Sequence, residues 1–195
     1  MSPKTFILIG RSGCGKGTQA QLLDAYIREN DKDTRRIFHL ETGTKFREFI
    51  KGDSLSQKRS REYYEKDLLQ PAFLAVHLWS HILIEEMTGE EHLFIDGTPR
   101  TLAECDALDS AMKFYERENP VVVYLNVSRD WSRERLVGRK RMDDDAESVE
   151  RRLNWYEESV VPVIEKLKNN PFYKFIEING EQTVEEVHAE IVSKI

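Results

Sequence analysis

Five short apolar runs occur along the chain, and the stretches between them carry apolar residues at helical spacing. The runs cover residues 5–10, 36–40, 92–96, 120–127 and 172–178. Short apolar runs that alternate with helices are typical of a parallel sheet covered on both faces. We therefore predict an α/β fold, a three-layer α/β/α sandwich with a five-stranded parallel sheet.

The stretches between the runs predict helices at defined places. A first helix is expected over about 15–30, helical segments fill 42–88, and a last helix starts near residue 183. The Trp and Phe residues of 73–79 are expected in the core. Residues 148–167 predict one long amphipathic helix whose apolar positions pack on the sheet. Parallel sheets bind ligands beyond the carboxyl ends of their strands, so functional motifs are expected directly after the strands.

Composition narrows the class of protein. With 195 residues, of which 39% are hydrophobic, the chain is long enough for one globular domain with a core and too short for two full ones. A net charge of −6 argues against a nucleic-acid binder. No apolar run approaches the roughly 20 residues that cross a bilayer, and the N-terminus lacks a signal-peptide pattern. The two cysteines, Cys14 and Cys105, give no disulfide framework, so we expect a cytoplasmic protein.

The first strand leads directly into a glycine-rich loop. The segment GRSGCGKGT (10–18) fits the pattern G-x-x-x-x-G-K through Gly10, Gly15 and Lys16, and it lies between a strand and a helix. Glycines allow successive backbone N–H groups to point at an anion, and the helix N-terminus adds partial positive charge. We predict a phosphate-binding loop, or P-loop, in which Lys16 neutralises the β- and γ-phosphates of a nucleoside triphosphate.

One position in this loop departs from the general motif. Gly17 follows the lysine where a hydroxyl residue normally binds Mg²⁺, and Thr18 comes one residue later. The variant GKGTQ (15–19) resembles the adenylate kinase family of nucleoside monophosphate kinases. We interpret Cys14 as a small residue that fills the loop, and a redox role is the alternative.

Two further motifs follow the second and third strands. ETGTKFRE (41–48) brings Arg47, and DGTPRT (96–101) brings Asp96 and Arg100, to the sheet edge that carries the P-loop. Guanidinium groups pair bidentately with phosphate oxygens, so two arginines beside a P-loop indicate a second phosphoryl group. A carboxylate at a strand end suits Mg²⁺, which prefers few protein ligands and several waters.

In this order the motifs resemble the same family, whose members carry T-G-x-x-x-R and D-G-F-P-R. The resemblance spans almost the whole chain and implies one nucleoside monophosphate kinase domain over 1–195, with a helical flap over about 42–75 that binds the acceptor. It implies reversible transfer of the ATP γ-phosphoryl group to AMP, with Mg²⁺ as cofactor and no zinc. The implied AMP-binding residues are Thr42, Gly43, Arg47, Leu69, Gln70, Gly97, Arg100, Glu104, Arg141 and Arg152.

Three positions depart from the family pattern. Thr98 replaces Phe, Gln70 replaces an apolar residue of the base pocket, and Glu104 replaces a Gln that reads the base. A Gln both donates and accepts hydrogen bonds, whereas a carboxylate only accepts. Glu104 could serve the amino group of adenine or cytosine, or the N–H edge of guanine, or it could be a solvated helix residue. AMP is the expected acceptor; a kinase for UMP/CMP or GMP and a non-catalytic nucleotide sensor are the alternatives.

Arginines dominate the segment after the fourth strand. Arg135 and Arg139 are four residues apart and share a helix face, and Arg141 opens an R-x-D-D pattern. A helix that begins near Asp143 would then carry Arg152. In the family the matching arginines surround the transferring phosphoryl group, and an added arginine can accelerate such a transfer by about 10³–10⁵-fold.

Lys140 alone separates Arg139 from Arg141, where relatives carry a lid loop or a whole lid subdomain. We therefore predict a truncated lid over about 138–143, with the aspartates at 143–145 pairing with arginines or starting the next helix. The implied catalytic residues are Lys16, Arg100, Arg139, Arg141 and Arg152. The implied ATP-binding residues are Gly13, Cys14, Gly15, Lys16, Gly17, Thr18, Arg135 and Arg139, with Asp96 holding Mg²⁺ through water. We expect a monomer that binds ATP and AMP but neither nucleic acid nor membrane.

Overall fold

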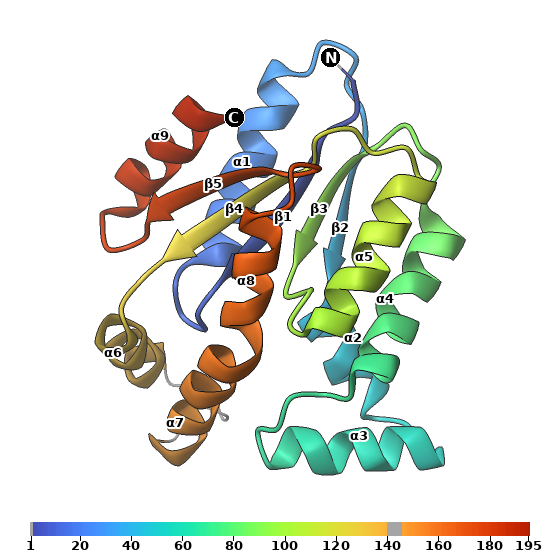
Figure 1. Ribbon diagram of the computed structural model, residues 1–195, viewed down its shortest axis with the longest axis vertical. Coiled ribbons are helices and arrows are strands. Elements are labelled where there is room, and N and C mark those ends of the chain that lie inside the picture. The colour runs from blue at the N-terminus through green and yellow to red at the C-terminus, as the bar shows by residue number, and fades with distance from the viewer. Residues whose placement is uncertain (1, 140–145) are drawn as a thin grey trace.

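A parallel sheet forms the centre of the molecule (Figure 1). The structure is a computed structural model that describes residues 2–139 and 146–195, without the side chain of Arg139. Within these residues the sheet has five strands in the order β2-β3-β1-β4-β5. They are β1 (Thr5–Gly10), β2 (Ile37–Glu41), β3 (His92–Asp96), β4 (Val121–Asn126) and β5 (Lys174–Asn179). Each strand lies within two residues of the apolar run that predicts it, which confirms the five-stranded parallel sheet.

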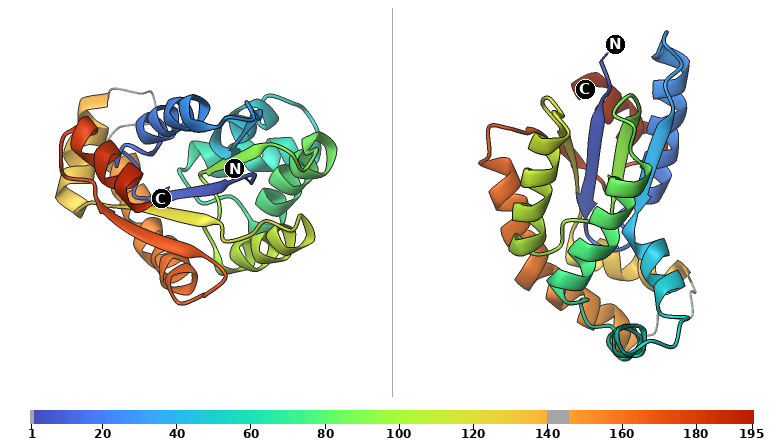
Figure 2. Two further views of the ribbon diagram at one scale, coloured as in Figure 1. Left: turned by 90° about the horizontal axis from the view of Figure 1, so that it is seen from above. Right: turned by 90° about the vertical axis from the view of Figure 1, so that its right-hand side faces the viewer.

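Helices cover both faces of this sheet (Figure 2). One face carries α1 (Lys16–Asn30) and α9 (Val184–Lys194), and the other carries α4 (Ala72–Glu86), α5 (Leu102–Phe114) and α8 (Val161–Lys168). Successive strand residues point to opposite faces: Phe6 and Leu8 pack with α1 and α9, whereas Ile7 and Ile9 pack with α4, α5 and α8. The predicted three-layer α/β/α sandwich is confirmed.

Four helices lie beyond the carboxyl ends of the strands (Figure 1). They are α2 (Thr42–Phe49), α3 (Leu55–Glu65), α6 (Arg129–Arg139) and α7 (Ala146–Trp155). The turn from α2 to α3 is fixed by Arg61, which donates hydrogen bonds to the carbonyls of Ile50 (2.8 Å) and Gly52 (2.7 Å). Ser54 and Gln57 then form a reciprocal capping box at the start of α3. These local contacts join α2 and α3 into one unit above the sheet edge.

Of two predictions about helices, one is confirmed in extent and the other is wrong for one residue. Residues 148–167 are helical throughout, as predicted, but a π-helical segment, η1 (Tyr156–Val160), interrupts the α-helix between α7 and α8. The cause is Pro162, which has no N–H to donate and whose ring crowds the preceding turn. Phe73 is 72% exposed in the first turn of α4, whereas Trp79 is buried as predicted. A helix start near Asp143 lies outside the described residues.

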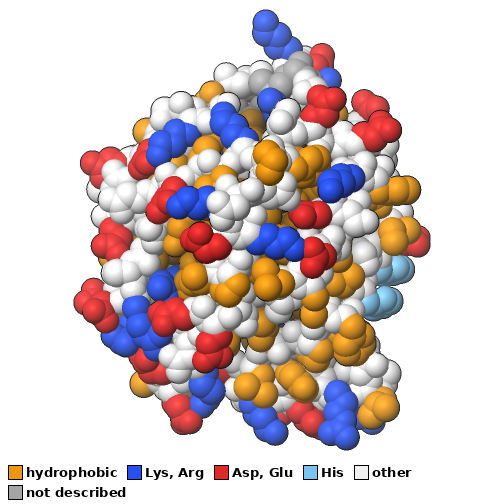
Figure 3. Space-filling model, viewed as in Figure 1, with side chains coloured by type: hydrophobic (Ala, Val, Ile, Leu, Met, Phe, Trp, Pro, Cys, Tyr) orange, Lys and Arg blue, Asp and Glu red, His pale blue; other side chains and the backbone are white. Residues whose placement is uncertain are grey.

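Charged side chains of both signs are interspersed on the face shown in Figure 3. This mixture accompanies the net charge of −6. Among the helices of residues 2–139 and 146–195, none is both long enough and apolar enough to cross a membrane.

Candidate active site

The P-loop connects β1 to α1. Gly13 (φ +81°) and Gly15 (φ +96°) adopt left-handed backbone angles, which glycine tolerates because it has no Cβ. The loop turns around the side chain of Lys16, whose Nζ donates hydrogen bonds to the carbonyl oxygens of Gly10 (2.8 Å) and Arg11 (2.9 Å). The ammonium group is therefore held at the mouth of the loop, at the carboxyl end of β1.

A cleft of about 700 Å³ opens beside this loop. Six of the predicted ATP-binding residues line it, together with the predicted magnesium ligand: Gly13, Gly15, Lys16, Gly17, Thr18, Arg135 and Asp96. Cys14 does not, because its side chain is buried in the core cluster between the sheet and α1. For Arg139 the structure describes only the position of its backbone at the end of α6.

A second cavity, of about 210 Å³, lies between the strand ends and α2, α3 and α7. Every predicted AMP-binding residue that the structure describes lines it: Thr42, Gly43, Arg47, Leu69, Gln70, Gly97, Arg100, Glu104 and Arg152. Arg141 lies outside the described residues. The cleft and the cavity share Ser12, Gly43, Arg47, Gly97 and Arg100, so the two spaces meet at the P-loop and the predicted phosphate-binding arginines.

Arg100 lies at this junction. Its Nε donates a 2.7 Å hydrogen bond to the carbonyl of Gly97, which fixes the guanidinium at the end of β3. Burial lowers the pKa of Arg100, the carboxylates of Glu104 and Asp96 partly counteract this effect, and the positive charge of Arg47 adds to it. A half-buried cation with a second cation beside it favours an anionic ligand. The electrostatics of the junction thus suit a phosphate group.

Glu104 is not a solvated helix residue, which corrects one interpretation of the sequence. Its side chain is 2% exposed and lies in the first turn of α5. Oε2 accepts a 2.6 Å hydrogen bond from the hydroxyl of Thr98, and Oε1 accepts one of 3.1 Å from Thr101. The Thr101 hydroxyl in turn accepts from the backbone N–H of Glu104 and caps the helix. The carboxylate is therefore held in one orientation at the wall of the acceptor cavity.

Gln70 lines the same cavity but is engaged within the protein. Its Oε1 accepts a 2.8 Å hydrogen bond from the Ser60 hydroxyl, and its Nε2 donates one of 2.9 Å to the Ser60 carbonyl. Ser60 is buried on α3, so this amide ties the loop before α4 to α3. The departure at position 70 has a structural role in the flap region.

Some residues of the acceptor cavity were not predicted from the sequence. Asp67, in the loop after α3, accepts a 3.0 Å hydrogen bond from Arg151 and lies 3.9 Å from Nε of Arg152. The ring of Trp155 on α7 lies 5.6 Å from the Arg100 guanidinium. The remaining unpredicted lining residues are Ser12, Phe46, Tyr64 and Leu68. Asp67 and Leu68 directly precede the predicted residues Leu69 and Gln70, and this proximity in the sequence was the available signal for this wall.

Comparison with known proteins agrees with this geometry. The family model for adenylate kinase matches residues 8–171. The chain belongs to the adenylate kinase family. It is 30% identical to an adenylate kinase of Corynebacterium urealyticum over 93% of both chains. It is 31% identical to one of Flavobacterium psychrophilum over 93% of this chain and 92% of the relative. It is 29% identical to one of Thermosynechococcus vestitus over 97% and 95%.

Membership of the adenylate kinase family makes the protein a phosphotransferase. The three departures from the family pattern, at Thr98, Glu104 and Gln70, can each be explained by contacts within the protein. Thr98 and Glu104 are hydrogen-bonded to each other, so they form one structural change rather than two. Gln70 is satisfied by Ser60 inside the flap region. None of these three described departures alters the P-loop or the arginines that meet at the junction of the two cavities.

Proposed function

We propose that this protein catalyses the reversible reaction ATP + AMP ⇌ 2 ADP. The observation that carries the proposal is the junction of the cleft and the acceptor cavity at Arg47 and Arg100. A donor phosphate held by the P-loop and an acceptor phosphate held by these arginines would approach each other there. Membership of the adenylate kinase family supports AMP as the acceptor.

On the donor side, the backbone N–H groups of the P-loop and Lys16 bind the β- and γ-phosphates. Arg135, which lines the cleft, and Arg139 are assigned to the same phosphates. Catalysis of the transfer is assigned to Lys16 together with Arg100, Arg139, Arg141 and Arg152.

Magnesium is the metal that suits this donor site. The residues present fit it, because two carboxylates, Asp96 and Glu41, line the cleft with Lys16 and Thr18, and Mg²⁺ prefers one or two carboxylates, water and phosphate oxygens. When bound, Mg²⁺ neutralises charge on the donor phosphates. Asp96 would hold it through water, and Gly17 supplies no hydroxyl for direct contact.

On the acceptor side, Arg47, Arg100, Arg141 and Arg152 bind the AMP phosphate and the transferred group, and Thr42, Gly43 and Gly97 shape the phosphate end of the cavity. The adenine ring lies against Leu69 and Gln70. The Glu104 carboxylate accepts a hydrogen bond from the adenine amino group, since a carboxylate can only accept. The flap of about 42–75 and the truncated lid of about 138–143 close over the two substrates.

The chemistry requires positioning and charge neutralisation rather than a protein nucleophile. The attacking oxygen belongs to an AMP phosphate, which is already anionic, so no general base is assigned. Arginines around the transferring group stabilise the charge that develops on it.

The test is production of ADP by the purified protein from ATP, AMP and Mg²⁺, and of ATP and AMP from ADP in the reverse direction. A protein that binds ATP and AMP but converts neither would be a nucleotide sensor, and the proposal would fail.

We further propose a cytoplasmic monomer. Both cysteines are buried and free, as is usual in a reducing compartment. Light scattering on a size-exclusion column tests the oligomeric state: a mass near 22.8 kDa is expected, and a dimer mass contradicts it.

A further inference from the structure

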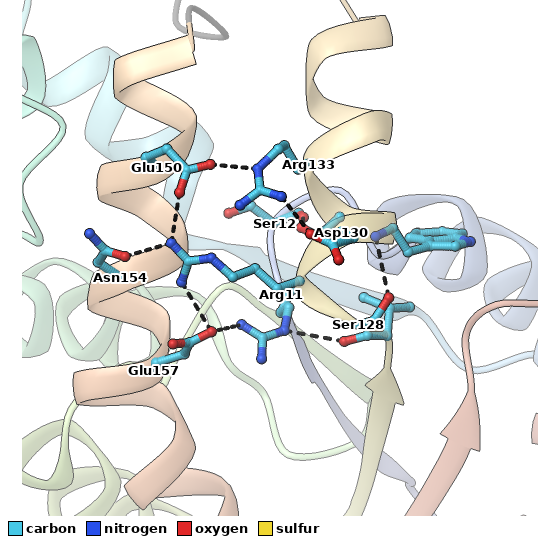
Figure 4. A network of polar contacts seen from close by, with 12 residues as sticks. Arg11, Ser12, Ser128, Asp130, Arg133, Glu150, Asn154 and Glu157 are labelled. Carbon is cyan, nitrogen blue, oxygen red and sulfur yellow. Dashed lines mark hydrogen bonds and ion pairs between the residues drawn. The ribbon is translucent and has the colours of Figure 1, made fainter.

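Helix α6 presents arginines to two different neighbours. Arg135 lines the donor cleft, whereas Arg129 and Arg133, four residues apart, face α7. Arg129 donates hydrogen bonds to Glu150 (2.8 Å) and Asn154 (2.6 Å), and Arg133 donates one to Glu150 (2.6 Å). Figure 4 shows Glu150, Asn154 and Glu157 projecting from one side of α7 and η1 toward α6. A single carboxylate, Glu150, thus joins two turns of α6 to α7.

The contacts continue into the P-loop through Glu157. Its Oε1 ion-pairs with Arg129 (3.1 Å) and accepts a 2.9 Å hydrogen bond from Arg11 (Figure 4). Arg11 also donates from Nε to the carbonyl of Val127 (3.2 Å), and its guanidinium lies 4.5 Å from the ring centroid of Tyr156. The second residue of the GRSGCGKGT loop is therefore bound at once to the end of β4 and to η1.

Opposite charges alternate along this set of side chains, which we call the α6 brace: Asp130, Arg133, Glu150, Arg129, Glu157 and Arg11. One exposed ion pair contributes little to stability, but several charges in a multidentate network hold a defined geometry more effectively. Hydrogen bonds from Arg133 and Arg129 lower the pKa of Glu150 to about 2. The carboxylate at the centre of the brace is therefore ionised at neutral pH.

Other contacts place α6 directly against the P-loop. The buried hydroxyl of Ser132 donates a 2.5 Å hydrogen bond to the carbonyl of Ser12. A Cβ on Gly13 would lie 3.2 Å from Cγ of Leu136, so the helix and the loop are in close contact there. Because this packing is tight, a small shift of α6 would move both the loop and Arg135.

We propose that Glu150 and Glu157 are positioning residues for phosphoryl transfer: they hold α6, and with it Arg135, at a fixed place over the P-loop. The inference rests on the proposed function. Neither of these two described residues lines the cleft or the acceptor cavity, so they act through α6 rather than by touching a nucleotide. In a chain whose lid is truncated, the brace supplies a fixed framework for donor-side arginines. The donor is affected rather than the acceptor, because Arg135 on α6 lines the donor cleft but not the acceptor cavity.

The test compares Glu150→Gln and Glu157→Gln with the unaltered protein. Calorimetric Kd and steady-state KM for ATP are each expected to rise about three- to tenfold, as for loss of one or two charged contacts. The KM for AMP is expected to stay within about twofold, since the 3.0 Å hydrogen bond from Arg151 to Asp67 still holds α7, and with it Arg152, at the acceptor cavity. Amide hydrogen exchange over 129–138 is expected to accelerate, with exchange in α9 unchanged.

Matched variants separate positioning from general stability. Asp106→Asn removes an exposed carboxylate that ion-pairs with Lys166 between α5 and α8, and it should leave both KM values unchanged. Glu157→Asp keeps the charge, so its Kd and KM for ATP should be closer to those of the unaltered protein than the values of Glu157→Gln are. In a double-mutant cycle, the loss of ATP-binding free energy in the double variant Arg11→Met/Glu157→Gln should be smaller than the sum of the losses in the two single variants. The reason is that each single change removes the same contact.

Unchanged ATP affinity in both glutamine variants would overturn the inference, as would equal losses for ATP and AMP. The calorimetric Kd for ATP does not depend on turnover. If the unaltered protein binds ATP but transfers nothing to AMP, the proposed function fails. The Kd values of the glutamine variants for ATP still test the α6 brace in that case.

Discussion

The hydroxyl of Thr98 donates a 2.6 Å hydrogen bond to the Glu104 carboxylate, and the two side chains are only 3% and 2% exposed. In the family pattern the same positions hold Phe and Gln, and a Phe cannot donate to its neighbour. The two departures are therefore coupled: the threonine satisfies one oxygen of a carboxylate that would otherwise be buried with fewer partners. This pair makes position 104 a fixed, acceptor-only group at the wall of the acceptor cavity.

Replacing Glu104 by Ala should raise the KM for AMP about tenfold or more, because a hydrogen bond to a charged group is lost. The KM for ATP should not change, since Glu104 does not line the donor cleft. Steady-state kinetics with each substrate varied in turn measures both. Asp106→Asn, two residues further along α5 and exposed, is the control; an unchanged KM for AMP in Glu104→Ala would remove Glu104 from base recognition.

Replacing Glu104 by Gln restores the family residue and should sharpen selectivity for AMP. A glutamine can donate to adenine N1 and accept from the amino group, whereas guanine presents an N–H where adenine has N1. We expect the ratio of kcat/KM for AMP to that for GMP to rise. The double variant Thr98→Phe/Glu104→Gln should show the same rise in this ratio. A ratio that falls in both variants would contradict the assignment.

Arg100 joins the two cavities, so its loss should affect the transfer step itself. Arg100→Ala should lower kcat by about 10³-fold or more, and Arg100→Lys by about 10²-fold, because lysine keeps the charge but not the planar fork. Arg59 is an exposed arginine of α3, so Arg59→Ala is the matched control and should leave kcat unchanged. Near-normal turnover by Arg100→Ala would show that the phosphates meet elsewhere.

The opposite end of the sheet determines part of the acid stability. The backbone N–H of Arg35 (2.9 Å) and the ring of His92 (3.2 Å) lower the pKa of Asp31 to about 2 against the effect of burial. A lowered folded-state pKa stabilises the protein above the unfolded value near 4 and loses this contribution as pH falls toward 2. Urea unfolding should therefore show a stability difference between wild type and Asp31→Asn that is constant at pH 5–7 and shrinks below about pH 4. A difference independent of pH would contradict this assignment.

The proposed truncation of the lid, over about 138–143, predicts a faster hydrolysis of ATP by water. Lid closure keeps water from the γ-phosphate, so a stub should shield it less well. We expect the rate of ATP hydrolysis without acceptor, relative to the transfer rate, to exceed that of a short-lid relative. Phosphate release measured for both enzymes under the same conditions decides this, and equal relative rates would count against poor shielding.

The strands and the grouping of the candidate phosphate-binding residues could be predicted because their signals are local. Each buried strand is an uninterrupted apolar run, and the motifs of Lys16, Arg47 and Arg100 directly follow strands, where a parallel sheet brings them together. The nine predicted AMP-binding residues that the structure describes line one cavity for the same reason.

Contacts between distant segments could not be predicted in this way. Asp67 reaches Arg151 from the loop after α3, and Arg11 reaches Glu157 across most of the chain. Such pairs depend on how helices pack, and the local pattern of charges does not encode that packing. The π-helical segment had a visible cause in Pro162, but the apolar periodicity of 148–167 outweighed it in the prediction.

AMP is the acceptor that the proposed function assigns to the ATP γ-phosphoryl group. The most direct measurement supplies ATP and Mg²⁺ with AMP, CMP, UMP or GMP in turn and follows ADP formation in a coupled assay. We expect kcat/KM for AMP to exceed the others. Turnover of another monophosphate above that of AMP, or no turnover with any of the four, would contradict the assignment.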